Sequence, residues 1–355
     1  MPDVTNTLNS GEAGRVTMRH EVRDTERRAP IVPADAAKLV ARGITLTVEE
    51  SDHRVFPVSD YADAGCRIAP AGSWLHAPDD EYVVGLKELP DLPPALRHRH
   101  VYFGHAYKGQ RGARELLRRF VNGGGALLDL EYLVDDDGRR LAAFGYWAGY
   151  IGAALAVLHH RGHLTVPLAP TTKESLDAML REGSAPVRAL VVGALGRSGR
   201  GACDALTTAG IEPTRWDLAE TRSLDLPALL DHDILVNAVL VTGPTQPFVT
   251  TTLLRHESHR LSVVADVTCD VTSEWNVLPI YDEATTWTEP VVRPSDTGVD
   301  VIAIDNLPSL LPKEASLAFS AELTPHLLSL VDNSPPWQRA LQTFRFACDR
   351  ERVNV

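Results

Sequence analysis

Short apolar runs alternate with amphipathic segments along the first part of the chain, a pattern typical of buried strands separated by helices. Residues 110–121 place Ala113, Leu116, Leu117 and Phe120 on one helical face. Such alternation predicts an α/β domain with a parallel sheet. The expected strands are 15–21, 44–49, 82–87, 100–105 and 126–130, and the expected helices are 33–42, 58–64 and 110–121.

A long helical pattern rich in Ala and Gly, residues 140–160, then leads the chain away from this first sheet. Residues 161–184 show no clear pattern, and a second α/β unit begins at Pro186. Its expected strands are 187–192, 214–217, 233–238, 261–267 and 299–304. An amphipathic C-terminal helix at 336–352 should pack on the first domain. We therefore predict two domains, residues 1–143 with 316–355 and residues 144–315, with residues 1–14 as a disordered tail.

Length and charge narrow the possible classes of protein. The chain has 355 residues, more than one ordinary core, and a net charge of −12, which argues against binding to nucleic-acid phosphates. Four scattered cysteines without a Cys/His cluster predict no metal site. No signal peptide is evident, and the longest apolar stretch, residues 147–158, is too short to span a membrane. We expect a cytoplasmic protein without membrane partners, a monomer or weak oligomer.

The apolar run Ala189–Val192 leads directly into a glycine-rich turn with Gly193, Gly196 and Gly199, followed by a helical pattern. Glycines in such a turn let the backbone approach a pyrophosphate, and the helix N-terminus offers N–H groups to it. Asp217 ends the next expected strand, where a ribose-binding carboxylate belongs. These features predict a Rossmann-like dinucleotide site; the alternative is a plain strand–helix turn with a capping aspartate.

Two ionisable residues end neighbouring strands of the first expected sheet. Lys87 and His105 should lie at its carboxyl edge, where open α/β sheets bind ligands, and both can serve as acid–base groups. The alternatives are a solvated lysine and a structural histidine. Nearby cations are Arg28, Lys108, Arg139 and Arg140, although Arg139 and Arg140 are also compatible with a solvated turn.

Several sequence blocks occur in an order that resembles one family. They are Glu26-Arg-Arg-Ala29, Gly85-Leu-Lys-Glu-Leu-Pro90, Phe103-Gly-His-Ala-Tyr-Lys108 with Gln110, Gly138-Arg-Arg140, Gly193-Ala-Leu-Gly-Arg197 and Ile304-Asp-Asn-Leu-Pro308. From about Arg19 to the C-terminus the chain resembles the NAD-dependent, L-lysine-forming saccharopine dehydrogenases. It resembles them more than the related alanine dehydrogenases and transhydrogenase subunits.

The resemblance implies two Rossmann-like α/β domains with an active-site cleft between them. It also implies the reversible oxidation of saccharopine by NAD to an imine, which water converts to L-lysine and 2-oxoglutarate. Lys87 would be the base and His105 the acid–base group for imine hydrolysis. The implied substrate-binding residues are Arg28, Lys108, Gln110, Arg140, Phe144, Thr268 and Asp270. The implied NAD contacts are Arg139, Gly196, Arg197, Asp217, Thr221, Leu240, Val267, Asp305, Asn306, Leu307 and Pro308.

Two alternatives to this function stay open. A related amino-acid or opine-type dehydrogenase would keep the hydride chemistry and use another amine or 2-oxo acid. A catalytically silent NAD-binding protein would keep only the cofactor site. The sequence does not distinguish lysine synthesis from lysine degradation.

Overall fold

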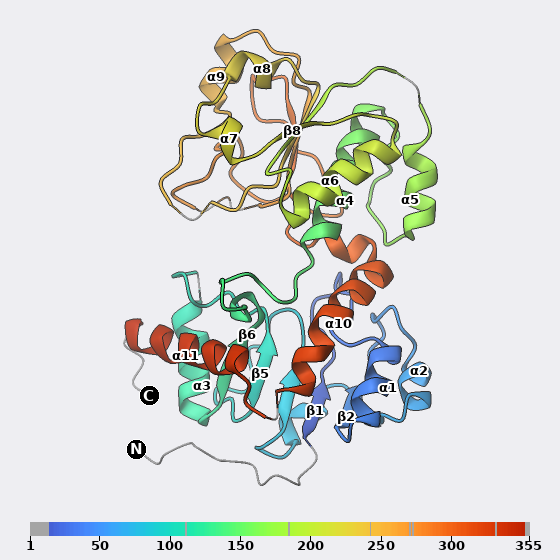
Figure 1. Ribbon diagram of the computed structural model, residues 1–355, viewed down its shortest axis with the longest axis vertical. Helices are drawn as coiled ribbons and strands as arrows, with labels where there is room; N and C mark the ends of the chain where they lie inside the picture. Colours follow the sequence, from blue (N-terminus) through green and yellow to red (C-terminus); the bar gives the residue numbers. More distant parts are fainter. Residues whose placement is uncertain are drawn as a thin grey trace. The chain divides into compact units, whose positions relative to one another are not determined.

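The structure, a computed structural model, describes residues 14–110, 112–183, 185–241, 243–269, 271, 273–330 and 332–351. Of the disordered tail expected at residues 1–14, all but Gly14 lies outside these residues. The described chain divides into two compact units (Figure 1). Unit 1 contains the described residues up to Ala143 and those from Ala315 onward, and unit 2 is Phe144–Glu314. The binding roles expected for the two domains remain predictions.

Unit 1 is built on a parallel six-stranded sheet, in the order β3-β2-β1-β4-β5-β6 within the described residues. Its strands are β1 Arg15–Met18, β2 Thr45–Glu49, β3 Arg67–Ala69, β4 Tyr82–Val84, β5 Arg99–Tyr102 and β6 Ala126–Asp129. Its helices are α1 Pro33–Ala41, α2 Val58–Asp63, α3 Ala113–Gly123, α10 Pro312–Leu328, whose first residues belong to unit 2, and α11 Pro335–Arg350. Short 3₁₀ turns are η1 Ser73–His76 and η2 Leu130–Tyr132.

The C-terminal helix α11 completes the core of unit 1. Phe344 of α11 packs edge-on against Phe120 of α3, with ring centroids 5.9 Å apart, in a cluster that includes Leu127 of β6. On the α10 side, the hydroxyls of Ser316 and Ser320 accept the backbone N–H groups of Ala29 and Val32. Segments from the two ends of the chain therefore form one folded unit.

Unit 2 has a parallel five-stranded sheet, in the order β11-β10-β9-β7-β8 for the described residues. Its strands are β7 Ala189–Val192, β8 Thr214–Trp216, β9 Ile234–Asn237, β10 Val263–Asp266 and β11 Asp300–Ile302. Its helices are α4 Gly145–His160, α5 Lys173–Leu180, α6 Arg197–Thr208, α7 Leu218–Thr221, α8 Leu226–Leu230 and α9 Thr251–His256, with the 3₁₀ turn η3 Leu307–Leu310. The strand order reverses between β7 and β9, the position at which open α/β sheets bind ligands.

Helices α4 and α6 pack side by side on this sheet, at a distance that only glycine permits (Figure 1). A Cβ atom on Gly149 of α4 would lie 1.7 Å from the carbonyl oxygen of Ser198. A Cβ atom on Gly201 of α6 would lie 1.9 Å from that of Tyr146. The Ala- and Gly-rich composition of α4 is thus a packing requirement, because larger side chains would separate the two helices.

The structure differs from the sequence prediction mainly at the boundaries of elements. Helix α4 begins at Gly145 instead of residue 140, because Arg140 pairs with Val134 in an isolated antiparallel bridge. The unpatterned region 161–184 contains α5, which Thr172 caps through the backbone N–H of Ser175. The edge strand β3 and the short helices α7 to α9 were also not predicted. None of the helices that the structure describes has the length and apolar character needed to cross a membrane.

A buried histidine in unit 1 has no polar partner among the described residues. His100 of β5 is fully buried, and neither of its ring nitrogens has a hydrogen bond there. The imidazole instead lies edge-on to Trp74 and Phe120, with centroid distances of 5.0 and 5.4 Å. Burial, with the nearby charge of Arg19, holds the pKa of His100 well below its ordinary value of 6.5. The ring is therefore neutral in the folded protein.

This environment predicts that His100 makes unit 1 sensitive to acid. Below pH 6.5 the unfolded chain binds a proton that the folded ring cannot hold, so the free energy of unfolding should fall by up to about 1.4 kcal/mol per pH unit. His100→Phe should remove this contribution. Native-state hydrogen exchange of β5 amides at pH 7.5 and 5.5 measures it, with the exposed His163→Gln as control. Equal pH dependence in wild type and His100→Phe would contradict the prediction.

Candidate active site

Lys87 lies at the carboxyl edge of unit 1, three residues beyond the end of β4, and was predicted as the last residue of that strand. A buried ion pair fixes its backbone. Arg19 and Glu21, which follow β1, are 3.2 Å apart, and Glu21 accepts the N–H groups of Leu86 and Lys87 at 2.7 and 3.0 Å. The Arg19 guanidinium also donates to the Lys87 carbonyl. This pair was not predicted, because the expected strand 15–21 ran through both residues, whereas β1 ends at Met18.

His105 lies at the same edge, three residues beyond β5, and faces a carboxylate that the sequence analysis did not select. Its Nδ1 is 3.8 Å from Oε2 of Glu131, and Lys108 Nζ is 2.8 Å from Oε1. Burial alone would raise the pKa of Glu131. The hydrogen bond from Lys108 and the charges of Lys108, His105 and Arg140 instead hold this pKa below its usual value. An ionised Glu131 thus gathers three of the residues selected from the sequence.

The remaining unit 1 candidates have distinct environments. Gln110 accepts the backbone N–H of Lys108 at 2.8 Å, so these two candidates are joined. Arg28 is buried and makes a two-point ion pair with Glu26, with distances of 2.8 Å from Nε and 2.5 Å from Nη2. Arg139 is 78% exposed and lies 3.4 Å from Asp137. The structure therefore groups Lys108, Gln110 and Arg140 with His105 through their contacts and charges.

The predicted glycine turn of unit 2 connects β7 to α6. Gly193 adopts φ = +83°, and its N–H donates to the carbonyl of Trp216 at the end of β8. A Cβ atom on Gly199 would lie 2.0 Å from the carbonyl oxygen of Gly193, whereas one on Gly196 would meet only that oxygen, at 3.3 Å, within the described chain. The backbone beside Gly196, at the N-terminus of α6, is thus open to a ligand.

Asp217 follows β8 and contacts the glycine turn directly. Its carboxylate accepts the N–H of Leu195 in the turn and that of Leu218, each at 2.9 Å. With Glu220 it also forms the capping box of α7, and Thr221 donates its hydroxyl to the Asp217 carbonyl at 3.0 Å. Asp217 was interpreted either as a ribose-binding carboxylate or as a helix cap. The two interpretations are compatible, since the carboxylate that caps α7 also lies against the glycine turn.

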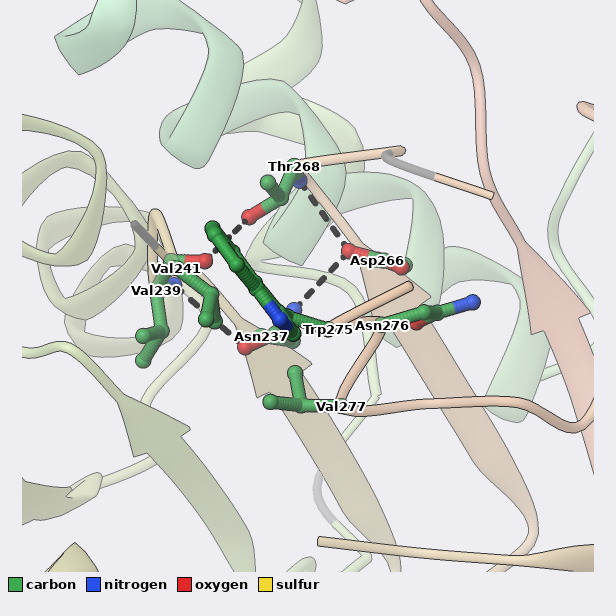
Figure 2. A pocket seen from close by; sticks show the side chains of 8 residues that line it. All are labelled: Asn237, Val239, Val241, Asp266, Thr268, Trp275, Asn276 and Val277. Carbon is green, nitrogen blue, oxygen red and sulfur yellow. Dashed lines mark hydrogen bonds between the residues drawn. The ribbon is translucent and has the colours of Figure 1, made fainter. Parts of the chain in front are cut away.

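The segments that follow β9 and β10 are joined by a buried carboxylate, Asp266 (Figure 2). Asp266 accepts hydrogen bonds from Asn237 Nδ2 at 3.0 Å, from the hydroxyl of Tyr281 at 2.7 Å and from the backbone N–H of Thr268 at 3.1 Å. Thr268 in turn donates its hydroxyl to the Val239 carbonyl at 3.0 Å. The cavity beside these groups measures about 10 Å³, room for about one water molecule.

Other candidates of unit 2 also lie at carboxyl ends of strands. Leu240 follows β9 and is half exposed, whereas Val267 follows β10 and packs against the α4 side of the core. Asp305, Asn306, Leu307 and Pro308 follow β11 and lead into η3, with Asn306 as its N-cap. Arg197 is the first residue of α6, and Phe144 is the N-cap of α4. Asp270 lies outside the described residues.

These residues fit a dinucleotide. The open backbone at Gly196, the N-terminus of α6 and the carboxylate of Asp217 lie along one sheet edge and match the needs of a pyrophosphate and a ribose. Burial raises the pKa of Asp266, and the hydrogen bonds that its carboxylate accepts partly oppose this shift. Within the described ranges, no group of three or more His, Cys, Asp or Glu side chains could hold a metal ion.

The family model for the N-terminal domain of alanine dehydrogenase/PNT matches residues 17–151, and the C-terminal domain model matches residues 181–344. The fold and these two matches place the chain in the alanine dehydrogenase/PNT class of proteins. Saccharopine dehydrogenase [NAD(+), L-lysine-forming] of Neurospora crassa is 41% identical over 92% of this chain and 94% of the relative, and that of Yarrowia lipolytica is 39% identical over 93% and 96%. The chain belongs to this saccharopine dehydrogenase family.

Solved structures share the fold at much lower identity. An L-alanine dehydrogenase covers 93% of both chains at 18% identity, with a TM-score of 0.65. The transhydrogenase from Sinorhizobium meliloti covers 91% of this chain and 97% of its own at 16% identity, with a TM-score of 0.67. The prediction of two parallel-sheet α/β domains is confirmed.

The close approach at Gly199 predicts a localised sensitivity to substitution. Gly199→Ala would push a methyl group into the Gly193 carbonyl, and overpacking of this kind costs about 1–3 kcal/mol. The melting temperature of unit 2 should fall by roughly 2–12 °C in a calorimetric scan without added ligand. Gly243→Ala is the matched control, because a Cβ atom there meets nothing within 4 Å in the described chain. Equal melting temperatures for the two variants would contradict the geometry.

Proposed function

We propose that this chain catalyses the reversible NAD-dependent oxidation of saccharopine to L-lysine and 2-oxoglutarate. One observation carries the proposal: Lys87 and His105 follow the neighbouring parallel strands β4 and β5 in a chain similar over nearly its whole length to enzymes of that name. The carboxyl ends of adjacent strands meet at one edge, so the fold itself brings the two groups together.

The cofactor would bind at the carboxyl edge of the unit 2 sheet. NAD, when bound, supplies a hydride acceptor for the substrate carbon. The open backbone at Gly196 and the first turn of α6, with Arg197, would hold the pyrophosphate, and Asp217 would accept a ribose hydroxyl. The other proposed contacts are Arg139, Thr221, Leu240, Val267, Asp305, Asn306, Leu307 and Pro308.

Lys87 and His105 would then divide the proton transfers. Lys87 Nζ would take the proton from the secondary amine of the substrate. The His105 imidazole would move protons during water addition and the release of lysine, and Glu131 would stabilise its charged form. The buried Arg19–Glu21 pair supports this role because it fixes the backbone from which Lys87 extends.

Cationic groups near His105 would bind the substrate carboxylates. Arg140 and Lys108 lie in the field of Glu131, and Gln110 is hydrogen-bonded to the Lys108 backbone. Arg28 would offer its guanidinium group, which the ion pair with Glu26 orients. Because Arg28 is buried, it is the least accessible of these cationic groups. Phe144, Thr268 and Asp270 are the remaining proposed substrate contacts.

The direct test follows NADH oxidation by absorbance with L-lysine and 2-oxoglutarate as substrates. Wild type should turn over this pair, and Lys87→Met or His105→Gln should each lower kcat by ~10²–10⁴-fold with little change in NADH affinity. Lys313→Met removes an exposed lysine of α10 and serves as the control. Turnover with pyruvate or another amine, and none with lysine and 2-oxoglutarate, would favour the alternative dehydrogenase. A variant with unchanged kcat would exclude its residue as an acid–base group.

The carboxylate of Asp217 also predicts NADH over NADPH. It would repel a 2′-phosphate and accept the 2′-hydroxyl, a contact of about 1.5–3 kcal/mol, or roughly 10–100-fold in kcat/KM. Asp217→Asn keeps an oxygen for the Leu195 N–H and removes the charge, so the NADH/NADPH ratio of kcat/KM should fall. Ser51→Ala, in unit 1, serves as the control. Equal kcat/KM with both cofactors in wild type would exclude this role for Asp217.

A further inference from the structure

We infer that Asp129, a residue outside the sites assigned above, is a positioning residue that holds the segments of His105 and Glu131 in register. The inference rests on the proposed function in one respect, that His105 acts on the substrate. Asp129 is the last residue of β6 and is fully buried. It cannot reach solvent, so its effect on the site must pass through the groups that it binds.

Three backbone N–H groups from two segments converge on this carboxylate. Oδ2 accepts the N–H of Gly104 at 3.2 Å, Oδ1 accepts that of Glu131 at 2.9 Å, and the N–H of His105 also donates to Asp129. Gly104 and His105 follow β5, whereas Glu131 follows β6. One carboxylate is therefore the common reference for both members of the His105–Glu131 pair, which are 3.8 Å apart.

The backbone of His105 needs such a restraint. Its φ of +48° lies in the left-handed region, which costs a residue with a side chain roughly 1–3 kcal/mol and persists only where surrounding contacts enforce it. At Gly104 a Cβ atom would lie 2.4 Å from a Leu127 methyl and 3.4 Å from Asp129 Oδ2. The segment is thus pressed against β6, where Asp129 receives its N–H groups.

The protonation state of Asp129 controls how many of these hydrogen bonds it can accept. Burial raises the pKa of Asp129 to about 7. The charge of Glu131 raises it further, whereas the three N–H donors lower it. The titratable groups that face it are Glu131, His105 and the phenols of Tyr102, Tyr107 and Tyr132, whose pKa values burial raises. Those phenols stay neutral near pH 7. Because burial outweighs these hydrogen bonds and raises the pKa, ionising Asp129 costs the folded state free energy, so the segments that it holds should open more readily as the pH rises through 7.

Asp129→Asn tests the inference, because it keeps the shape and turns one acceptor into an amide donor. We expect kcat for NADH-dependent turnover of lysine and 2-oxoglutarate to fall roughly 10–100-fold, since a shift of about 1 Å can cost 10² in rate. The KM for NADH should change less than twofold, and any inflection of kcat near pH 7 that belongs to Asp129 should disappear. Asp63→Asn, exposed on unit 1, is the matched control. Wild-type kcat and an unchanged pH profile in Asp129→Asn would overturn the inference.

A second measurement does not depend on turnover. Residue-resolved hydrogen exchange in the wild type should show the amides of Gly104, His105 and Glu131 losing protection together as the pH rises from 6 to 8, after correction for intrinsic rates. Constant protection of these amides would overturn the inference even if Asp129→Asn failed to fold. If the three amides lose protection together in a wild type that does not use lysine and 2-oxoglutarate, the proposed function is excluded, whereas the inference about Asp129 stands.

Discussion

Parallel pairing of the strands in both sheets is the constraint on which the site chemistry depends. In a parallel sheet the carboxyl ends of all strands lie at the same edge, so the segments that follow the strands meet there even when they are remote in sequence. In unit 1 this edge collects Arg19, Glu21, Lys87, His105 and Glu131. In unit 2 it collects the glycine turn, Asp217, Thr268 and the approach to η3. Each sheet therefore gathers its candidate functional residues at one edge.

Both edges use the same local device. The last residues of β6 and β10, Asp129 and Asp266, are buried aspartates that accept the N–H group two residues further on, at 2.9 and 3.1 Å. Each also binds a group at the end of the neighbouring strand: Gly104, two residues beyond β5, in one case and Asn237, the last residue of β9, in the other. Where a sheet ends, backbone N–H groups lose their ladder partners and must find others. A short carboxylate turned inward satisfies several at once and joins two loops.

The sequence alone predicted the features with a local cause. The glycine turn, the parallel strands and Asp217 are readable because apolar runs, glycines and a carboxylate occur at short, fixed spacing. The edge strand β3 was missed because Ile68 is 38% exposed and the strand lacks an apolar run. Glu21, Asp129 and Glu131 were missed because their partners lie in other strands. The placement of Lys87 and His105 at the unit 1 edge was thus predictable, whereas the carboxylates beside them became evident only from tertiary contacts.

The connection of the two units has a consequence for how the protein is made. Unit 2 is inserted in unit 1, because the chain leaves unit 1 after Ala143 and returns at Ala315. During synthesis all strands and helices that belong wholly to unit 2 emerge before α11, which covers α3 and β6 with Phe344 and its neighbours. The inserted unit can therefore complete its core while the first sheet still lacks its cover, and that apolar face stays exposed until α11 has been synthesised. On the ribosome, unit 2 can therefore be folded while unit 1, which begins earlier in the sequence, is still incomplete.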